Sequence, residues 1–200
     1  MKTSHHEEKV RLLTRKLGDL MAKRHPPYDS KVEWCAAGLS DSTIRQESAR
    51  LDVVLPAEHQ AALSVFDGLL VDCPIDAGDV RAGLPEGHIL ISQIQFMREW
   101  NDDASLAFQE DVNSLWTDTY KPDQVRVIGP VKKLGFHKDW IMIGYTDYGQ
   151  LYLDFVPELG GAIGQLIVVE TDDEGPVVQV VAPDFIALLQ GFIEAMSVTP

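Results

Sequence analysis

Residues 140–182, WIMIGYTDYGQLYLDFVPELGGAIGQLIVVETDDEGPVVQVVA, decide the fold. This stretch contains four runs rich in β-branched, aromatic and aliphatic residues, at 140–144, 151–156, 165–170 and 177–181. Segments with turn chemistry, 145–150 and 171–175, join the runs in pairs. Connections this short favour antiparallel hairpins, because parallel strands need a long crossover. The stretch therefore predicts an antiparallel sheet.

Amphipathic patterns before and after this stretch in the sequence predict helices. After Pro183 the apolar residues recur with the period of a helix, at Phe185, Leu188, Leu189, Phe192 and Met196. This stripe predicts a C-terminal helix that packs on the sheet. Near the start, residues 7–24 carry a similar stripe, and His25-Pro26-Pro27 is expected to stop that helix.

Two shorter helices are predicted between residues 41 and 68. Thr43 and Gln46 have the spacing of a capping box, which places a helix start near 41–43. Pro56 suits the first position of the next helix, which we expect to run through Phe66 to Asp67-Gly68.

The middle of the chain has weaker patterns. Residues 72–88 are predicted to form a connecting loop, 89–91 a short strand and 94–100 a helix, whereas 101–123 show no clear preference. Residues 125–131 suggest a strand interrupted by Gly129-Pro130. These elements together predict an α+β fold with N-terminal helices, a central antiparallel sheet and a C-terminal amphipathic helix packed on it. We divide the chain into a helical extension, 1–30, and a domain, 31–200.

Charge is distributed unevenly over the 200 residues. Residues 1–24 have seven basic and three acidic side chains, a net charge of +4, whereas the remainder carries −18 and the whole chain −14. An acidic surface repels nucleic acid and attracts basic proteins; the alternative is that the acidity only maintains solubility. No apolar run is long enough to cross a membrane and no secretory signal is evident, so we expect a cytoplasmic protein that does not bind membranes.

The search for catalytic motifs is negative. The sequence has no GxGxxG, GxxxxGK[ST], HExxH or GxSxG motif, and its histidines have no metal-ligand spacing. Cys35 or Cys73 could pair with His88 or His137 as a nucleophile, but a free cysteine is more often a small buried hydrophobe. The glycine-rich run 160–165 precedes a strand, which favours a turn over a phosphate site. We therefore predict no enzyme activity, cofactor or metal.

Three blocks of sequence resemble the SMI1/KNR4 family of the SUKH superfamily. The first runs from Gly38 through Glu47 and Leu55-Pro56 to the Asp67-Gly68 turn, and the second joins 129–131 to 137–144, with Met142 where the family usually has proline. The third block is the most specific. It contains a Leu-Asp-x-x-Pro element at 153–157, a Gly-Gly pair at 160–161, a Gly-Gln-Leu-Ile element at 164–167 and an Ala-Pro-Asp-Phe element at 182–185. The resemblance covers about residues 35–196.

The resemblance implies a non-enzymatic binding protein. Bacterial members are taken to be immunity proteins that neutralise toxin domains, often nucleases or deaminases, whereas fungal members regulate cell-wall synthesis and signalling. The leading hypothesis is an immunity protein that binds a basic cognate toxin domain; the alternative is a regulatory or scaffold module with an endogenous partner. The acidic clusters are the candidate contacts: Asp102, Asp103, Glu110, Asp111, Asp172, Asp173 and Glu174. The sequence leaves the oligomeric state open.

Overall fold

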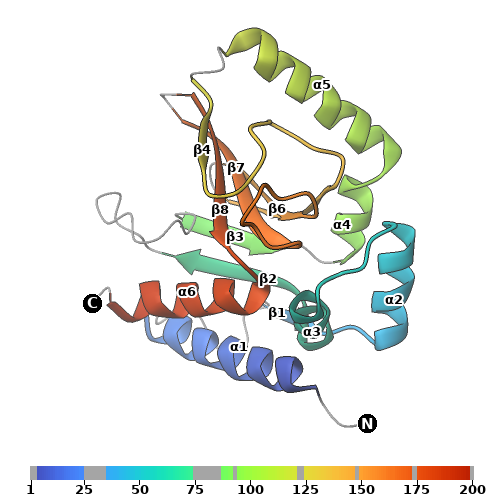
Figure 1. Cartoon of the computed structure of the whole chain (residues 1–200). Helices are drawn as coiled ribbons and strands as arrows, with labels where there is room; N and C mark the ends of the chain where they lie inside the picture. The colour runs from blue at the N-terminus through green and yellow to red at the C-terminus, as the bar shows by residue number, and fades with distance from the viewer. Residues whose placement is uncertain are drawn as a thin grey trace.

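The computed structural model describes residues 4–24, 35–73, 87–91, 94–120, 124–146, 149–172 and 175–198. Its helices are α1 (His5–Arg24), α2 (Asp41–Arg50), α3 (Ala57–Val65), α4 (Ile94–Trp100), α5 (Asp103–Thr119) and α6 (Phe185–Val198). Its strands are β1 (Cys35–Ala37), β2 (Phe66–Cys73), β3 (Gly87–Ile91), β4 (Arg126–Ile128), β5 (Trp140–Tyr145), β6 (Gly149–Asp154), β7 (Gln165–Asp172) and β8 (Gly175–Ala182). The predicted α+β class is confirmed (Figure 1).

The strands form one sheet in the order β1-β2-β3-β5-β6-β7-β8-β4. Each pair from β1 to β8 is antiparallel, as the short connections predict, but β4 runs parallel to β8. The predicted central antiparallel sheet is confirmed in β5 to β8, and the sheet as a whole is mixed because β4 joins its edge in the parallel direction. The long connection between β4 and β8, through β5, β6 and β7, permits this, because parallel strands need a crossover of a dozen or more residues.

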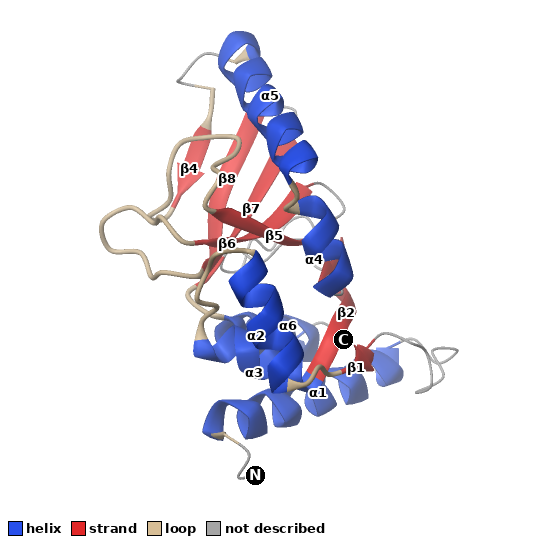
Figure 2. Ribbon diagram, turned by 90° about the vertical axis from the view of Figure 1, so that its right-hand side faces the viewer, coloured by secondary structure: helices blue, strands red, loops and turns tan. Residues whose placement is uncertain are grey.

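Alternate residues of the central strands fill two separate cores, one on each face of the sheet. In β5, Ile141 and Ile143 belong to the core beneath the N-terminal helices and α6, whereas Trp140 and Met142 belong to the opposite core. The loop through Phe136 and part of α5 cover this second core (Figure 2). Burial on both faces explains why these strands have continuous apolar runs.

Helices α1 and α6 lie side by side on the first face, with α6 between α1 and the sheet (Figure 1). The predicted stripe of α6 is buried, and α1 adds Val10, Leu17 and Met21 to the same core. The predicted boundary at residue 30 stays a prediction, although α1 and the domain share this core. No helix in the described part of the chain combines the length and hydrophobicity that a membrane span requires.

Three local predictions in the N-terminal half are wrong. Ser40, not Thr43, caps α2, because its side chain accepts a hydrogen bond from the Thr43 amide. Pro56 is the residue before α3 rather than its first residue. The third helix ends at Val65, and Phe66 begins a strand directly, because residues 66–73 pair with both β1 and β3.

The predicted loop at 72–88 differs from the structure at both ends. Residues 72–73 belong to β2 and 87–88 to β3, and 74–86 lie outside the described residues. The predicted helix stop at 25–27 lies outside them as well, as do the turn positions 147–148 and 173–174.

The β6–β7 loop, residues 155–164, is held by a buried polar cluster around Asp154. The Asp154 carboxyl group accepts hydrogen bonds from the Trp140 indole, the Val156 amide and the Gln165 side-chain amide, at 3.0, 2.9 and 3.0 Å. Gln165 also donates to the Pro130 carbonyl and accepts from the Ala162 amide. Asp154 of the Leu-Asp-x-x-Pro element and Gln165 of the Gly-Gln-Leu-Ile element therefore act as a framework that fixes the loop.

Two glycines of this loop allow a sharp test of its geometry. Gly160 and Gly164 both have positive φ, at 97° and 79°, as the turn prediction requires. A Cβ atom at Gly164 would lie 2.2 Å from Cγ of Pro56, whereas one at Gly160 would meet nothing within 4 Å. We expect Gly160→Ala to lower the free energy of unfolding by about 1 kcal/mol through backbone strain alone. Gly164→Ala should lower it by about 2–4 kcal/mol, because overpacking adds to the strain.

Urea unfolding of the two variants tests this difference. Equal losses of stability would contradict the close contact between this loop and the segment that leads into α3.

Candidate protein-binding surface

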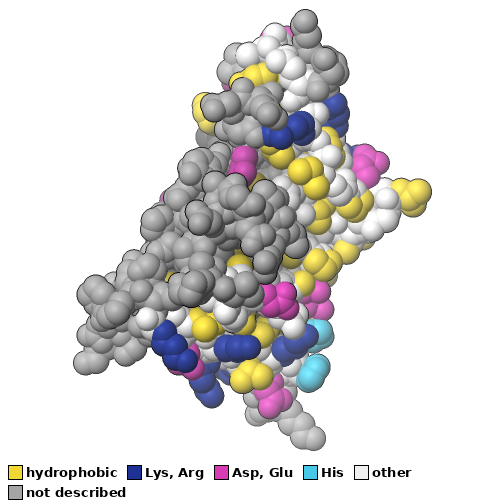
Figure 3. All heavy atoms as spheres, turned by 90° about the vertical axis from the view of Figure 1, so that its left-hand side faces the viewer, with side chains coloured by type: hydrophobic (Ala, Val, Ile, Leu, Met, Phe, Trp, Pro, Cys, Tyr) yellow, Lys and Arg dark blue, Asp and Glu magenta, His cyan; other side chains and the backbone are white. Residues whose placement is uncertain are grey.

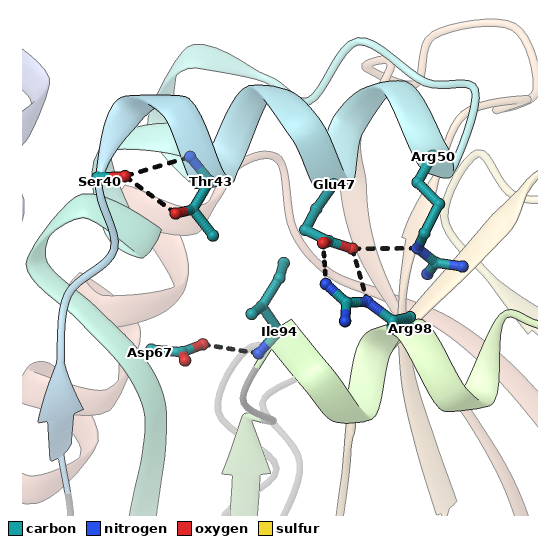
Figure 4. Close-up of polar contacts among 7 residues, drawn as sticks. All are labelled: Ser40, Thr43, Glu47, Arg50, Asp67, Ile94 and Arg98. Carbon is teal, nitrogen blue, oxygen red and sulfur yellow. Dashed lines mark hydrogen bonds and ion pairs between the residues drawn. The ribbon is translucent and has the colours of Figure 1, made fainter.

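Helix α4 is fixed to the rest of the domain at both ends and in its middle, and Figure 4 shows the contacts at its start and in its middle. At its start the Asp67 carboxyl accepts a hydrogen bond from the Ile94 amide at 2.6 Å. In its middle Arg98 binds Glu47 of α2 through two hydrogen bonds. Directly after its end, the Asn101 side chain donates to the carbonyl of Met142 in β5 and accepts from the amide of the same residue. The short helix therefore has a defined position against both α2 and the sheet.

Glu47 is the central charge of this junction. Its side chain is only 2% exposed and also accepts a hydrogen bond from Arg50 at 3.0 Å. The hydrogen bonds from Arg98, supported by the one from Arg50, hold the pKa of Glu47 below its usual range despite its burial. Burial raises the pKa of Asp67, although its bond to the Ile94 amide opposes this. Glu47 therefore holds α4 against α2 through its bonds to Arg98.

Helix α5 continues from this fixed point, and its first half is tied to the second core. The Asp102 carboxyl caps the helix by accepting from the Ser105 amide at 2.8 Å. On the inner side Gln109 is buried, donates to the Trp100 carbonyl and accepts from the Tyr152 hydroxyl. The outer side of α5 is thereby held in one orientation.

That outer side is acidic. From residue 99 to residue 119 the chain has no lysine or arginine, and its six acidic residues are all exposed: Glu99, Asp102, Asp103, Glu110, Asp111 and Asp118. Phe108 lies among them with 67% of its surface exposed, one helical turn before Asp111. Exposed aromatic residues surrounded by charge are common in protein interfaces. We call residues 99–119 the acidic helix surface.

The predicted contacts are only partly brought together. Asp102, Asp103, Glu110 and Asp111 share the acidic helix surface. Asp172 is the last residue of β7, and its side chain is not described. Asp173 and Glu174 lie outside the described residues. All seven stay predicted contacts.

Basic side chains gather at the other end of the molecule from α5, and a smaller group lies near its upper end (Figure 3). Lys and Arg side chains gather on the part of Figure 3 that corresponds to α1. The exposed basic residues described there include Arg11, Arg15, Lys16 and Lys23. The basic N-terminal segment predicted from the sequence therefore presents exposed basic side chains on α1.

The remaining chemical candidates show no assembled site within the described residues. His137 is half-buried, and its Nδ1 atom accepts a hydrogen bond from the Asp139 amide at 3.1 Å. Cys35, Cys73 and His88 lie on strands, but their side chains are not described. In that part of the chain, no group of three or more His, Cys, Asp and Glu side chains is placed to hold a metal ion.

Sequence reasoning missed Phe108 and the junction at Glu47. Residues 101–120 contain no glycine or proline, and Asp102 precedes Ser105 with the spacing of a helix cap. These two features of the sequence are sufficient to predict the helix α5. The pairing of Glu47 with Arg98 had none, because these residues are 51 positions apart.

Comparison with known proteins agrees with this architecture. The family model described as SMI1 / KNR4 family (SUKH-1) matches residues 38–191. The match includes α2 to α5, the whole of β2 to β8 and the first half of α6. No curated protein matches the sequence significantly.

Proposed function

The chain belongs to the SMI1/KNR4 (SUKH-1) family, whose members are protein-interaction domains and often immunity proteins, and from this premise we propose that it neutralises a cognate toxin domain by binding it directly. We place this action in the cytoplasm and assign the protein no catalytic role. The toxin domain is basic, of the nuclease or deaminase type.

The acidic helix surface carries the proposal. Its six carboxylates, with no lysine or arginine between residues 99 and 119, attract a positively charged protein over about 8 Å in physiological salt. A nuclease needs a basic surface for its substrate, so an acidic inhibitor would bind where the nucleic acid binds. We therefore assign the predicted charged contacts to this function: Asp102, Asp103, Glu110, Asp111, Asp172, Asp173 and Glu174.

The first test is coexpression with the toxin domain encoded by the neighbouring gene. We expect the chain to restore growth to cells that produce the toxin and to form a stable complex with it after purification. Neither protection nor a complex would contradict the proposal. Specific binding to a housekeeping protein, with no toxin gene nearby, would instead support the regulatory or scaffold alternative.

The second test measures association rates with a variant that removes four charges from α5: Asp102→Asn, Asp103→Asn, Glu110→Gln and Asp111→Asn. Asparagine at 102 can still cap α5, so the fold is preserved. We expect kon at low salt to fall about tenfold or more and its salt dependence to weaken, with a small effect on koff.

A matched control removes four exposed acidic charges from other helices, through Glu8→Gln, Asp19→Asn, Asp41→Asn and Glu194→Gln. If this control slows association equally, only the net charge matters and the acidic helix surface is not the contact.

A further inference from the structure

Two adjacent loops expose apolar side chains on a different part of the molecule from α5. The β6–β7 loop carries Leu159 and Ile163, which are 101% and 72% exposed, and the loop between α2 and α3 carries Val54, which is 85% exposed. They account for three of the six exposed large hydrophobic residues in the described part of the chain. The loops touch where Gly164 lies against Pro56, next to Ile163. We call Val54, Leu159 and Ile163 the apolar loop surface.

The β6–β7 loop has a fixed shape. Within it the Gly161 amide donates to the Glu158 carbonyl and the Gln165 amide to the Ala162 carbonyl. Bonds to the framework come from the Glu158 amide, which donates to Pro130, and from the Gly164 amide, which donates to Asp154. A loop that is ordered before binding loses little conformational entropy when a partner covers it. Leu159 and Ile163 are thus presented as preformed anchors.

Acidic side chains lie on the same two loops and at the start of α3. Asp52 and Glu158 are exposed, and Glu58 is partly exposed at the start of α3. The Nζ atom of Lys132 lies 3.7 Å from Oε1 of Glu158, and Nδ1 of His6 lies 3.5 Å from Oε1 of Glu58. The negative charge of these two carboxylates is therefore partly compensated. In Figure 3, hydrophobic side chains reach the surface along the edge formed by the loops at the front of Figure 1, with Asp and Glu side chains beside them. The charge around the apolar loop surface suits a basic partner.

We propose that the apolar loop surface is the energetic centre of the toxin interface, where Leu159 and Ile163 enter an apolar depression on the basic toxin domain. This inference rests on the proposed function. It divides the work between two surfaces: the charges of α5 accelerate encounter, whereas the apolar anchors slow dissociation.

The test compares Leu159→Ser and the double variant Leu159→Ser/Ile163→Ser with the wild type, using the purified toxin domain from the neighbouring gene. Both positions are exposed, so the melting temperature should be unchanged. We expect koff to rise about tenfold for the single variant and a hundredfold or more for the double variant, with kon nearly constant. Leu12→Ser is the matched control, because Leu12 is 64% exposed on α1, and it should change koff less than twofold.

The outcomes separate this inference from the proposed function. If the wild type binds the toxin and the double variant binds equally well, the inference is overturned while the proposed function stands. If the wild type does not bind, both are overturned. If the wild type is a dimer in solution and the double variant a monomer, the apolar loop surface is a self-association interface and the inference is overturned.

Discussion

Replacing Asp154 with alanine is expected to lower the free energy of unfolding by about 3–5 kcal/mol. The Asp154 side chain is fully buried and accepts hydrogen bonds from Trp140, Val156 and Gln165. Alanine would leave all three donors without this acceptor in a region from which water is excluded. Each such donor carries a desolvation penalty of about 1–3 kcal/mol, and partial relaxation reduces the total.

Urea unfolding measures this loss, and two further variants define its origin. Asp154→Asn keeps one acceptor oxygen and should retain part of the stability. Asp139→Ala removes a carboxylate that is 43% exposed and should change stability by less than about 1 kcal/mol. If Asp154→Ala behaved like Asp139→Ala, the polar cluster would not be a major source of stability.

The same substitution should loosen the β6–β7 loop. Hydrogen exchange of the Val156 and Ala162 amides should accelerate more than exchange in α6, because these amides donate to the side chains of Asp154 and its partner Gln165. The folded fraction of the variant should then also bind the toxin more weakly, since the apolar anchors lose their fixed position.

The second large effect is an acid sensitivity that depends on His59. This residue of α3 is buried against Phe185, with ring centroids 5.3 Å apart, and among the described residues neither of its ring nitrogens has a hydrogen-bond partner. Burial lowers the pKa of His59 from 6.5 to about 4, because the charged ring would be desolvated and unpaired. In the unfolded chain the same imidazole takes up a proton near pH 6.5.

The sign of the effect follows from this difference. Between pH 6.5 and 4 the unfolded state binds a proton at His59 that the native state does not, so the native state loses stability as the pH falls. The contribution is complete above pH 6.5 and lost at about pH 4. At about 1.4 kcal/mol for each pKa unit, the loss amounts to about 3 kcal/mol.

His59→Leu should abolish this part of the pH dependence. At pH 7 the variant should be at least as stable as the wild type, because leucine buries no unsatisfied polar atoms. Unfolding by urea at pH 7, 6, 5 and 4 provides the measurement, and His5→Leu at an exposed position of α1 provides the control. An unchanged pH profile in His59→Leu would show that other groups cause the acid sensitivity.

The contrast between His59 and Glu47 shows two ways in which this fold treats a buried ionisable group. Glu47 is surrounded by arginines and keeps its charge, so its bonds to Arg98 and Arg50 are lost only when the carboxylate is protonated below its ordinary pKa. His59 has no polar partner in the part of the chain that the structure describes, and it stays neutral above its lowered pKa. Neither environment is visible in the residues next to it in the chain.

Much of the candidate surface also depended on the tertiary structure. The acidic residues were evident from composition, but their arrangement on one outer side required α5, which the residue pattern at 101–123 did not indicate clearly. Leu159 and Ile163 resemble core residues in the sequence. They are exposed because Asp154 and Gln165 fold the loop outward.

The amino-acid pattern alone was sufficient for β5 to β8, α1, α4 and α6 and for the family, because apolar periodicity and turn residues act over a few neighbouring positions. The tertiary structure decided that residues 66–73 form a strand rather than a helix end, that β4 runs parallel to β8, and that Arg98 reaches Glu47. In each of these cases the partner is distant in the chain. The physical reason is that a strand or a buried charge is stabilised by the groups opposite it, which local sequence does not specify.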